Sequence, residues 1–201
     1  MNWNLFPSIL VINLPHRTDR LIEFSNEASR IGIEQFTIIP GILDENPVKG
    51  FNEAQYNALS SIPDGGLILE DDVVFKNYGH LEDAMYSLPL DWDLCYLGAN
   101  IVGTDLCDWP TPSFVSRHLR RVTQAWTTHA IAYSAKGVKR ILELWQPEHI
   151  MDDILRINLE KLQAFIVAPM VADQRPGFSD IWKTETDYGF FKQGNERMAK
   201  W

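Results

Sequence analysis

The chain has 201 residues, 45% of them hydrophobic and 22% charged, which are values typical of a globular protein, and its formal net charge is −9. This length suits one domain with a full core, and the acidic balance argues against nucleic-acid binding, because phosphate contacts need clustered Lys and Arg. No apolar run approaches the roughly 18 residues of a membrane span, and no basic, apolar leader opens the chain. We therefore expect a cytoplasmic protein without a transmembrane segment, although peripheral membrane contact stays open.

The first half of the chain alternates strand patterns with helical stripes. A buried strand is predicted over Ser8–Leu14, and a helix follows whose apolar side chains repeat from Leu21 to Ile31 and which Gly32 ends. A second short strand covers Gln35–Ile39, and a loop follows over 42–50. The next expected elements are a helix from Asn52 to Ser60, a strand carrying Leu67–Leu69, a helix over His80–Leu88 and a strand over Asp91–Gly98.

The second half continues this alternation. After a loop over 103–112, the composition of Val115–Tyr133 predicts one or two strands. The elements expected after it are a helix over Val138–Trp145, a helix opening at Met151, a strand over Leu162–Ala168 and a polar tail from Trp182. We expect an α/β fold with a mostly parallel central sheet and helices on both faces, as one domain over 1–182 followed by a tail over 183–201.

Three acids, Glu70, Asp71 and Asp72, stand directly after the apolar run that Gly65 and Gly66 introduce. If the strand continued through them, Glu70 and Asp72 would point to one side and Asp71 to the other. Two carboxylates about 4 Å apart repel by roughly 4 kcal/mol near a protein surface. A divalent cation with oxygen ligands would offset that repulsion, whereas the alternative is a solvated acidic turn.

Ligands of such α/β sheets bind at the carboxyl ends of the strands. The acids follow one strand, and the segment from Asn13 to Arg20 follows the first strand. We therefore expect both segments to border one site.

Six short blocks, spread between residues 8 and 182, carry a resemblance to a known family. They are Val11–Arg20 (VINLPHRTDR), Leu67–Phe75 (LILEDDVVF), Asp91–Gly98 (DWDLCYLG), Thr128–Gly137 (THAIAYSAKG), Ile150–Asp152 (IMD) and Pro169–Ile181 (PMVADQRPGFSDI). In this order the blocks resemble the motifs of glycosyltransferase family 25, which includes lipopolysaccharide-type and collagen-type β-galactosyltransferases. The chain departs from the family at Gly50–Gln55, which lacks the usual Cys and His, and at Ile150-Met151, where the family has Pro-Val.

The resemblance implies a GT-A-like, Rossmann-type fold and a hexosyltransferase activity. The donor would be a nucleotide sugar, with a UDP-sugar such as UDP-galactose as the first expectation, and the acceptor a saccharide or glycoconjugate of lipopolysaccharide or other glycan biosynthesis. The implied cofactor is Mn²⁺ or Mg²⁺, which can neutralise charge on a departing diphosphate. Within this scheme Asp72 would hold the metal, Glu70 the donor ribose or the metal, and Asp71 would support them or bind the metal too.

The residues expected to bind the donor are Asn13, Arg17, Arg20, His129 and Gln174. Arg suits bidentate contact with phosphate, but Arg17 and Arg20 could instead form surface ion pairs with Asp19 or Glu23. Asn13 could contact the base or ribose, or be a turn residue. His129 could bind phosphate, or be a core histidine whose hydrogen bonds are satisfied.

An inverting transfer needs a group that takes the proton from the acceptor hydroxyl. Asp152 is the first candidate for this base and Asp180 the second. The alternative for Asp152 is a charge that the helix dipole favours at a helix amino terminus.

Two other functions stay open. One is a catalytically weak or inactive domain of the same fold that binds nucleotide sugars or glycans, which the missing Cys and His favour. The other is a two-metal phosphoesterase, which requires at least two further acids or histidines beside Glu70 and Asp72.

Overall fold

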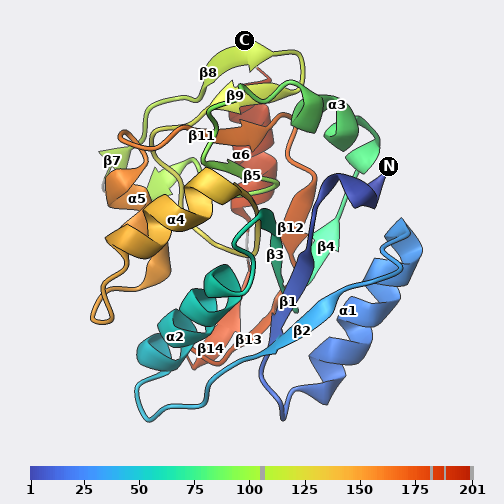
Figure 1. Ribbon diagram of the computed structural model, residues 1–201, viewed down its shortest axis with the longest axis vertical. Helices are drawn as coiled ribbons and strands as arrows, with labels where there is room; N and C mark the ends of the chain where they lie inside the picture. Colours follow the sequence, from blue (N-terminus) through green and yellow to red (C-terminus); the bar gives the residue numbers. More distant parts are fainter. Residues whose placement is uncertain (105–106, 182, 188, 200–201) are drawn as a thin grey trace.

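The computed structural model of the protein describes residues 1–201 apart from 105–106, 182, 188 and 200–201 (Figure 1). Its largest sheet has eight strands in the order β2-β1-β3-β10-β5-β11-β9-β8. The bounds of these strands are β1 Ile9–Asn13, β2 Thr37–Pro40, β3 Gly65–Glu70, β5 Leu94–Tyr96, β8 Ser113–Ser116, β9 Leu119–Arg121, β10 Ala130–Ser134 and β11 Ala164–Val167.

The sheet is mixed, so the expectation of a mostly parallel sheet was wrong. β1 pairs in parallel with β2 and β3, and β5 does so with β11. The pairs β10–β3, β10–β5, β11–β9 and β8–β9 are antiparallel. The difference comes from the segment predicted to hold one or two strands, which instead forms the β8–β9 hairpin and then β10. The chain therefore enters β10 at the edge where β3 ends.

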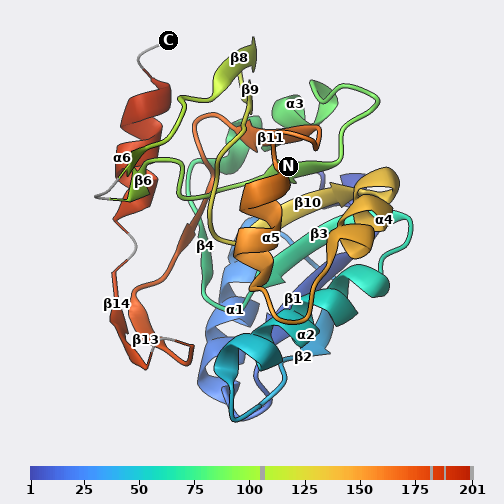
Figure 2. The same ribbon diagram turned by 90° about the vertical axis from the view of Figure 1, so that its left-hand side faces the viewer.

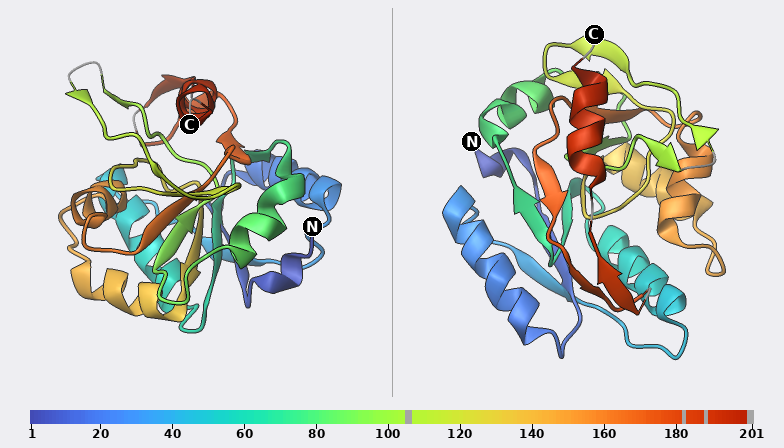
Figure 3. Two further views of the ribbon diagram at one scale, coloured as in Figure 1. Left: turned by 90° about the horizontal axis from the view of Figure 1, so that it is seen from above. Right: turned by 180° about the vertical axis from the view of Figure 1, so that it is seen from behind.

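Helices cover both faces of the sheet, as expected (Figure 3). The helical segments are η1 Trp3–Leu5, α1 Thr18–Ile31, α2 Pro47–Ser60, η2 Tyr78–His80, α3 Leu81–Tyr86, α4 Ala135–Leu144, α5 Met151–Asn158 and α6 Phe190–Met198. Alternate strand residues supply two cores: Ile68 and Ile131 pack with α2, α4 and α5, whereas Leu67, Leu69 and Ala130 pack with α1 and α3. This alternation is the period-2 geometry of buried strands.

Helix α1 ends where the sequence predicts and α2 begins earlier than predicted. Gly32 takes a left-handed φ of 82° and its N–H bonds to the carbonyls of Ala28 and Ser29, which closes α1. Asn46 caps α2 through the N–H of Val48, and Pro47 occupies its first turn. The expected cap near Asn52 was wrong, because that side chain is buried and donates to the carbonyls of Gln146 and Pro147.

The carboxyl-terminal segment folds back onto the sheet. Strand β12 (Ala172–Gln174) pairs with β4 (Val73–Phe75), and β13 (Gly177–Ser179) pairs with β14 (Thr184–Thr186). The predicted polar tail contains β14 and α6, which lie along one side of the molecule (Figure 2). Met198 is buried in the core, and Asn195 accepts a hydrogen bond from the N–H of Met170. Trp182, the predicted start of the tail, lies outside the described residues.

Two smaller features complete the fold. Strands β6 (Gly103–Thr104) and β7 (Cys107–Asp108) form a short hairpin where a loop was expected. Among the helices that the structure describes, none has both the length and the apolar character needed to cross a membrane.

Candidate active site

The carboxyl ends of β1 and β3 open into a cavity of about 610 Å³. Ile12 and Leu14 line it from the first strand, and Glu70, Asp71 and Asp72 line it from the end of β3. The site therefore lies at the sheet edge that the sequence indicated. Other lining residues come from the loop after β2, from α2, from the segment before β10, from the start of α5 and from the β12–β14 region. They include Leu43, Phe51, Trp126, Thr128, Asp152, Gln174 and Asp180.

All three acids face this one cavity. Strand β3 ends at Glu70, and Asp71 and Asp72 form a turn before β4, so the alternation expected along a continuing strand does not apply. Asp71 and Asp72 are each only 6% exposed. The acids are therefore neither a solvated turn nor arranged on two sides of a strand.

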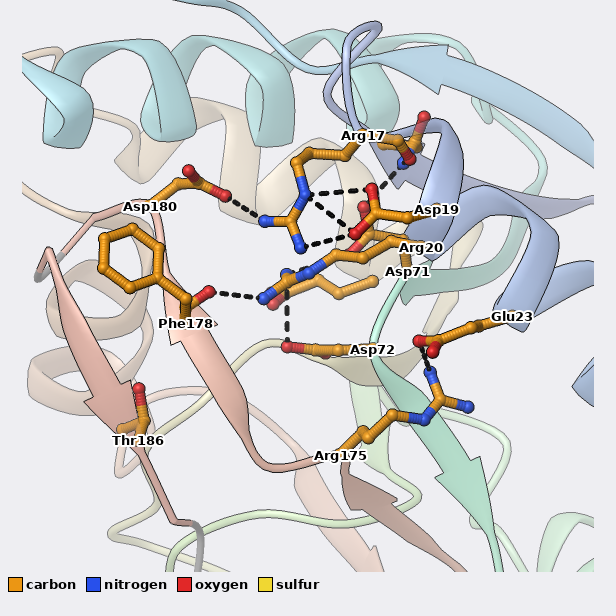
Figure 4. A network of polar contacts seen from close by, with 12 residues as sticks. Arg17, Asp19, Arg20, Glu23, Asp71, Asp72, Arg175, Phe178, Asp180 and Thr186 are labelled. Atoms are coloured by element: carbon orange, nitrogen blue, oxygen red, sulfur yellow. Dashed lines mark hydrogen bonds and ion pairs between the residues drawn. The ribbon is translucent and has the colours of Figure 1, made fainter.

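Asp71 is held by the chain's own groups (Figure 4). Its carboxylate accepts a hydrogen bond from Asn13 Nδ2 at 2.7 Å and from Arg20 Nη1 at 3.2 Å. Arg20 also lies 3.7 Å from Asp72 Oδ2 and donates to the carbonyl of Phe178 at 2.7 Å. Burial raises the pKa of Asp71, while Asn13 and Arg20 oppose that rise. Asn13 and Arg20 thus fix the acid turn against the start of α1.

Arg17 lies beside this network and forms two ion pairs. It contacts Asp180 at 2.6 Å and Asp19 at 3.0 Å. The contact with Asp180 ties the turn after β13 to the start of α1 (Figure 4). Asp180 is thus already paired with a guanidinium, whereas Asp152 has no Arg or Lys partner among the described ion pairs.

Asp72 is the acid with the least complete set of partners. Its Oδ1 is buried without a hydrogen-bond partner, and so is Oε1 of Gln174, which lines the same cavity. Burial raises the pKa of Asp72 to about 6, and the Asp71 charge adds to the rise, while Arg20 and a hydrogen bond from Gln174 oppose it. Two buried acceptor oxygens without donors favour a ligand that brings positive charge or N–H and O–H groups.

Glu70 lies on the β10 side of the cavity, where two side chains donate hydrogen bonds to it. Its Oε1 accepts a hydrogen bond from the Thr128 hydroxyl at 2.7 Å and from the Gln55 amide at 3.3 Å. Burial raises its pKa well above the usual range, and the charges of Asp72 and Asp152 add to the rise. The sequence predicted only a helix cap for Gln55. Its contact with Glu70 is a role that no sequence pattern indicated.

Asp152 lies in the first turn of α5 and lines the cavity. Burial raises its pKa to about 6, while hydrogen bonds from the Thr127 backbone and the Thr128 side chain oppose the rise. The Thr128 hydroxyl thus contacts both Asp152 and Glu70. Thr127 has a φ of +84°, which is rare for a β-branched residue and marks a constrained turn at this wall.

His129 lies in the core and not in the site. Its ring is fully buried, with Nδ1 3.2 Å from Thr127 Oγ1 and Nε2 3.3 Å from the carbonyl of Ala172. Burial lowers its pKa to about 4, so the ring is neutral at pH 7. Both ring nitrogens have partners and the residue does not line the cavity, which is the arrangement of a core histidine, the alternative given for this residue.

The other predicted residues divide into two groups. Seven of them line the cavity: Arg20, Glu70, Asp71, Asp72, Asp152, Gln174 and Asp180. Asn13 and Arg17 lie behind that lining and position Asp71 and Asp180, so each acts through another residue. Thr128 stands next to His129 in the same block, and Trp126 two residues before it. His129 was predicted as a site residue from this block, and neither Thr128 nor Trp126 was.

The residues of this cavity could hold a divalent cation only together with ligands from a substrate or water. Among the residues that the structure describes, no group of three or more His, Cys, Asp or Glu side chains could hold a metal ion. Mg²⁺ is commonly held by one or two carboxylates together with substrate phosphates and water. The unpartnered oxygens of Asp72 and Gln174 suit that shared arrangement. They do not provide the further ligands that a two-metal phosphoesterase requires.

Comparisons with known proteins give only distant likenesses. No family model matches the chain, and no curated protein does. One similar solved structure is a protein assigned as a glucose-1-phosphate thymidylyltransferase of Bacillus anthracis with sucrose, at 10% identity and a TM-score of 0.45, covering 94% of this chain and 75% of that one. Another is a glycosyltransferase involved in glycosylation of the major capsid of PBCV-1, at 14% identity and a TM-score of 0.34, covering 68% and 65%. Both scores lie below 0.5, and we draw no conclusion from either.

Proposed function

We propose that the protein is a metal-dependent inverting glycosyltransferase. It would move a sugar from a nucleotide-sugar donor, with UDP-galactose as the first candidate, to a hydroxyl of a glycan or glycoconjugate. The cofactor would be Mn²⁺ or Mg²⁺, bound where Asp72 and Gln174 leave buried oxygens without partners, with Glu70 beside them.

One observation carries this proposal. Five of the six blocks that resemble family 25 contribute residues to the lining of one cavity, although they are spread over more than 160 residues of sequence. The sixth block, Asp91–Gly98, contributes none, and its residues from Asp93 onward are buried. A resemblance without function would not require the polar residues of separate blocks to meet at one cavity.

The donor would lie along the β1 side of the acids. When bound, the cation would offset the charge that develops on the departing diphosphate. Arg20 would provide a second positive charge from α1, and Asn13 would keep Asp71 in place. Arg17 acts further back, since its guanidinium holds Asp180 and Asp19 and does not line the cavity.

Asp152 would act as the base. A carboxylate whose pKa is about 6 is mostly ionised at pH 7 and is still a stronger proton acceptor than an exposed aspartate. It would take the proton of the acceptor hydroxyl while that oxygen bonds to the anomeric carbon. The bond from this carbon to the diphosphate oxygen breaks in the same displacement, with inversion of configuration.

The test is a transfer assay with a panel of nucleotide sugars and Mn²⁺, in which wild type is compared with Asp72→Ala and Asp152→Asn. Asp153→Asn is the matched control, because Asp153 also lines the cavity but pairs with Arg156 at 3.1 Å. The proposal requires activity in wild type and in the control, and loss of at least about a hundredfold in the other two. Wild type as inert as Asp72→Ala would end the enzymatic interpretation.

A second candidate is a domain that binds nucleotide sugars or glycans with little or no turnover. The Arg20 guanidinium favours it, since it already lies against Asp71 and Asp72 where a cation would be needed. Nucleotide binding without transfer or donor hydrolysis would identify this case.

A further inference from the structure

The wall of the cavity opposite β1 is built by three consecutive residues, Trp126, Thr127 and Thr128. They precede β10, which pairs with β3 on the side of that strand away from β1. Along the sheet edge, Asn13 and Arg20 therefore lie on one side of the acids and this wall on the other. A donor held by the acids and Arg20 leaves the Trp126 side for a second ligand.

Trp126 is fixed in place at this wall. Its backbone exchanges hydrogen bonds with Asn100, N to O at 2.8 Å and 2.9 Å, in an antiparallel bridge. The ring of Trp109, which is 7% exposed, packs near the Trp126 ring, with centroids 6.3 Å apart and ring planes tilted by 54°. Trp126 itself remains partly exposed and lines the cavity. A partly exposed indole that is packed near a second indole and held by its backbone can provide a rigid flat surface in a pocket.

The wall also holds the proposed base. The Thr127 backbone and the Thr128 side chain both hydrogen-bond to Asp152. The positive φ of Thr127 turns the chain between them, so that Trp126 and Thr128 both contribute to the lining. A constrained backbone of this kind persists where the surrounding structure fixes it, and such residues cluster at functional sites. The Trp126 indole is thus two residues along the chain from Thr128, whose side chain contacts Asp152.

We propose that Trp126 forms the acceptor subsite and that its ligand is a pyranose sugar. The C–H groups of one sugar face would stack on the indole, whose aromatic face carries partial negative charge, and a hydroxyl at the sugar's edge would point to Asp152. This assignment rests on the proposed function for its reaction, but the sugar-binding step can be measured without turnover.

The first experiment separates acceptor from donor. Trp126→Ala is expected to raise the acceptor KM by about tenfold or more and to leave the donor KM and the metal-dependent hydrolysis of donor within about twofold. Trp126→Phe, which keeps an aromatic face, should recover most of the acceptor affinity. Trp145→Phe is the matched control, because Trp145 packs on Tyr56 with centroids 4.5 Å apart and does not line the cavity.

The second experiment measures binding alone. Intrinsic fluorescence is titrated with methyl β-galactoside, methyl β-glucoside and lactose, and with UDP plus Mn²⁺, in wild type and in Trp126→Phe. A saccharide-dependent change that Trp126→Phe removes supports the acceptor subsite, even if the protein proves inactive and UDP does not bind.

Two results would overturn the inference. In one, Trp126→Ala weakens UDP or donor binding as much as it weakens the acceptor, which would make the indole a platform for the nucleobase. In the other, Trp126→Phe and wild type respond identically to every saccharide, and the acceptor KM of both Trp126 variants equals that of wild type. If Trp126→Ala fails to fold, the Trp126→Phe titration still decides between these results.

Discussion

Asp93 and Asp72 are two buried aspartates that sit in very different surroundings. Asp93 is fully buried just before β5, and its carboxylate contacts Arg140 at 2.6 Å, Lys136 at 3.1 Å and the N–H of Gln163 at 2.7 Å. Asp72 is 6% exposed, and its nearest described cation is Arg20 at 3.7 Å from Oδ2. Oδ1 of each aspartate is buried without a hydrogen bond, but that of Asp93 has the Lys136 ion pair and that of Asp72 has no described ion pair. Both belong to blocks that resemble family 25.

Asp93 stabilises the fold through contacts within the chain, whereas Asp72 is the acid that we propose binds a ligand. The charge of Asp93 is neutralised by the chain itself, and its contacts join α4 to the segment before β11. The charge of Asp72 is only partly offset, and burial raises its pKa to about 6. Buried charge without full compensation is costly, and it is common where a protein binds cations or performs proton transfer.

Substitution of Asp93 should give the largest loss of stability. Asp93→Asn removes the charge that faces Arg140 and Lys136. Because both cations are partly exposed and remain solvated, we expect a loss of about 1.5–3 kcal/mol of unfolding free energy. Urea denaturation would measure it. A change below about 1 kcal/mol would mean that the cluster around Asp93 is not the structural element we describe.

Substitution of Asp72 should act in the opposite direction on stability. Its folded pKa of about 6 lies above the usual aspartate value of 3.8, and one pKa unit corresponds to about 1.36 kcal/mol. Asp72→Asn should therefore raise the unfolding free energy at pH 7 by about 1–3 kcal/mol while abolishing transfer. A variant that loses both stability and activity would place Asp72 in the same class as Asp93.

The pH dependence of stability and of activity follows from the same upward shift of the carboxyl pKa values. Because the folded pKa of Asp72 and Asp152 exceeds 3.8, the folded state binds protons more tightly, and these groups add stability as pH falls from above 6 towards 4. Activity should change oppositely, with kcat/KM falling about tenfold per pH unit below about 6. Rates between pH 4.5 and 8 would test this, and Asp153→Asn should keep the shape of the profile but move its midpoint to lower pH, because the Asp153 charge adds to the rise of the Asp152 pKa. A flat profile would exclude Asp152 as the base.

The ion pair between Arg17 and Asp180 should have the smallest effect. Both side chains are partly exposed, at 19% and 25%, so a double-mutant cycle with Arg17→Met and Asp180→Asn should give a coupling of about 0.5–1 kcal/mol. Faster amide hydrogen exchange across β13 and β14 would accompany it. Unchanged exchange there would show that the pair does not hold this hairpin to α1.

The sequence was a good guide to helices and strands that carry strong periodicity. The apolar stripe of α1 and its glycine stop, the strands β1, β3 and β11, and the helix α4 lie close to their expected positions. The start of α2 was missed, although Asn46 followed by Pro47 is a recognisable cap. The order of the strands could not be predicted from the sequence, because the pairing of β10 between β3 and β5 depends on contacts between residues far apart in the sequence.

The site shows the same division between local and long-range information. The acids at the end of β3 became candidates through a local pattern, and Asp152 through its place at the start of a helix and the resemblance to family 25. The burial of His129, the contact of Gln55 with Glu70 and the pairing of Arg17 with Asp180 depend on residues distant in sequence. Asn13 was expected to touch the donor, but its amide binds Asp71 and the carbonyl of Arg17.

The most direct test of the central claim is the unfolding free energy of wild type and Asp72→Asn with UDP-galactose and Mn²⁺, added together and separately. A ligand at a hundred times its Kd adds about 2.7 kcal/mol to the folded state. We predict this gain for wild type only when both are present, and little or none for Asp72→Asn. An equal gain in both proteins, or none in wild type across a panel of nucleotide sugars, would contradict the assignment of this cavity to a metal-held nucleotide sugar.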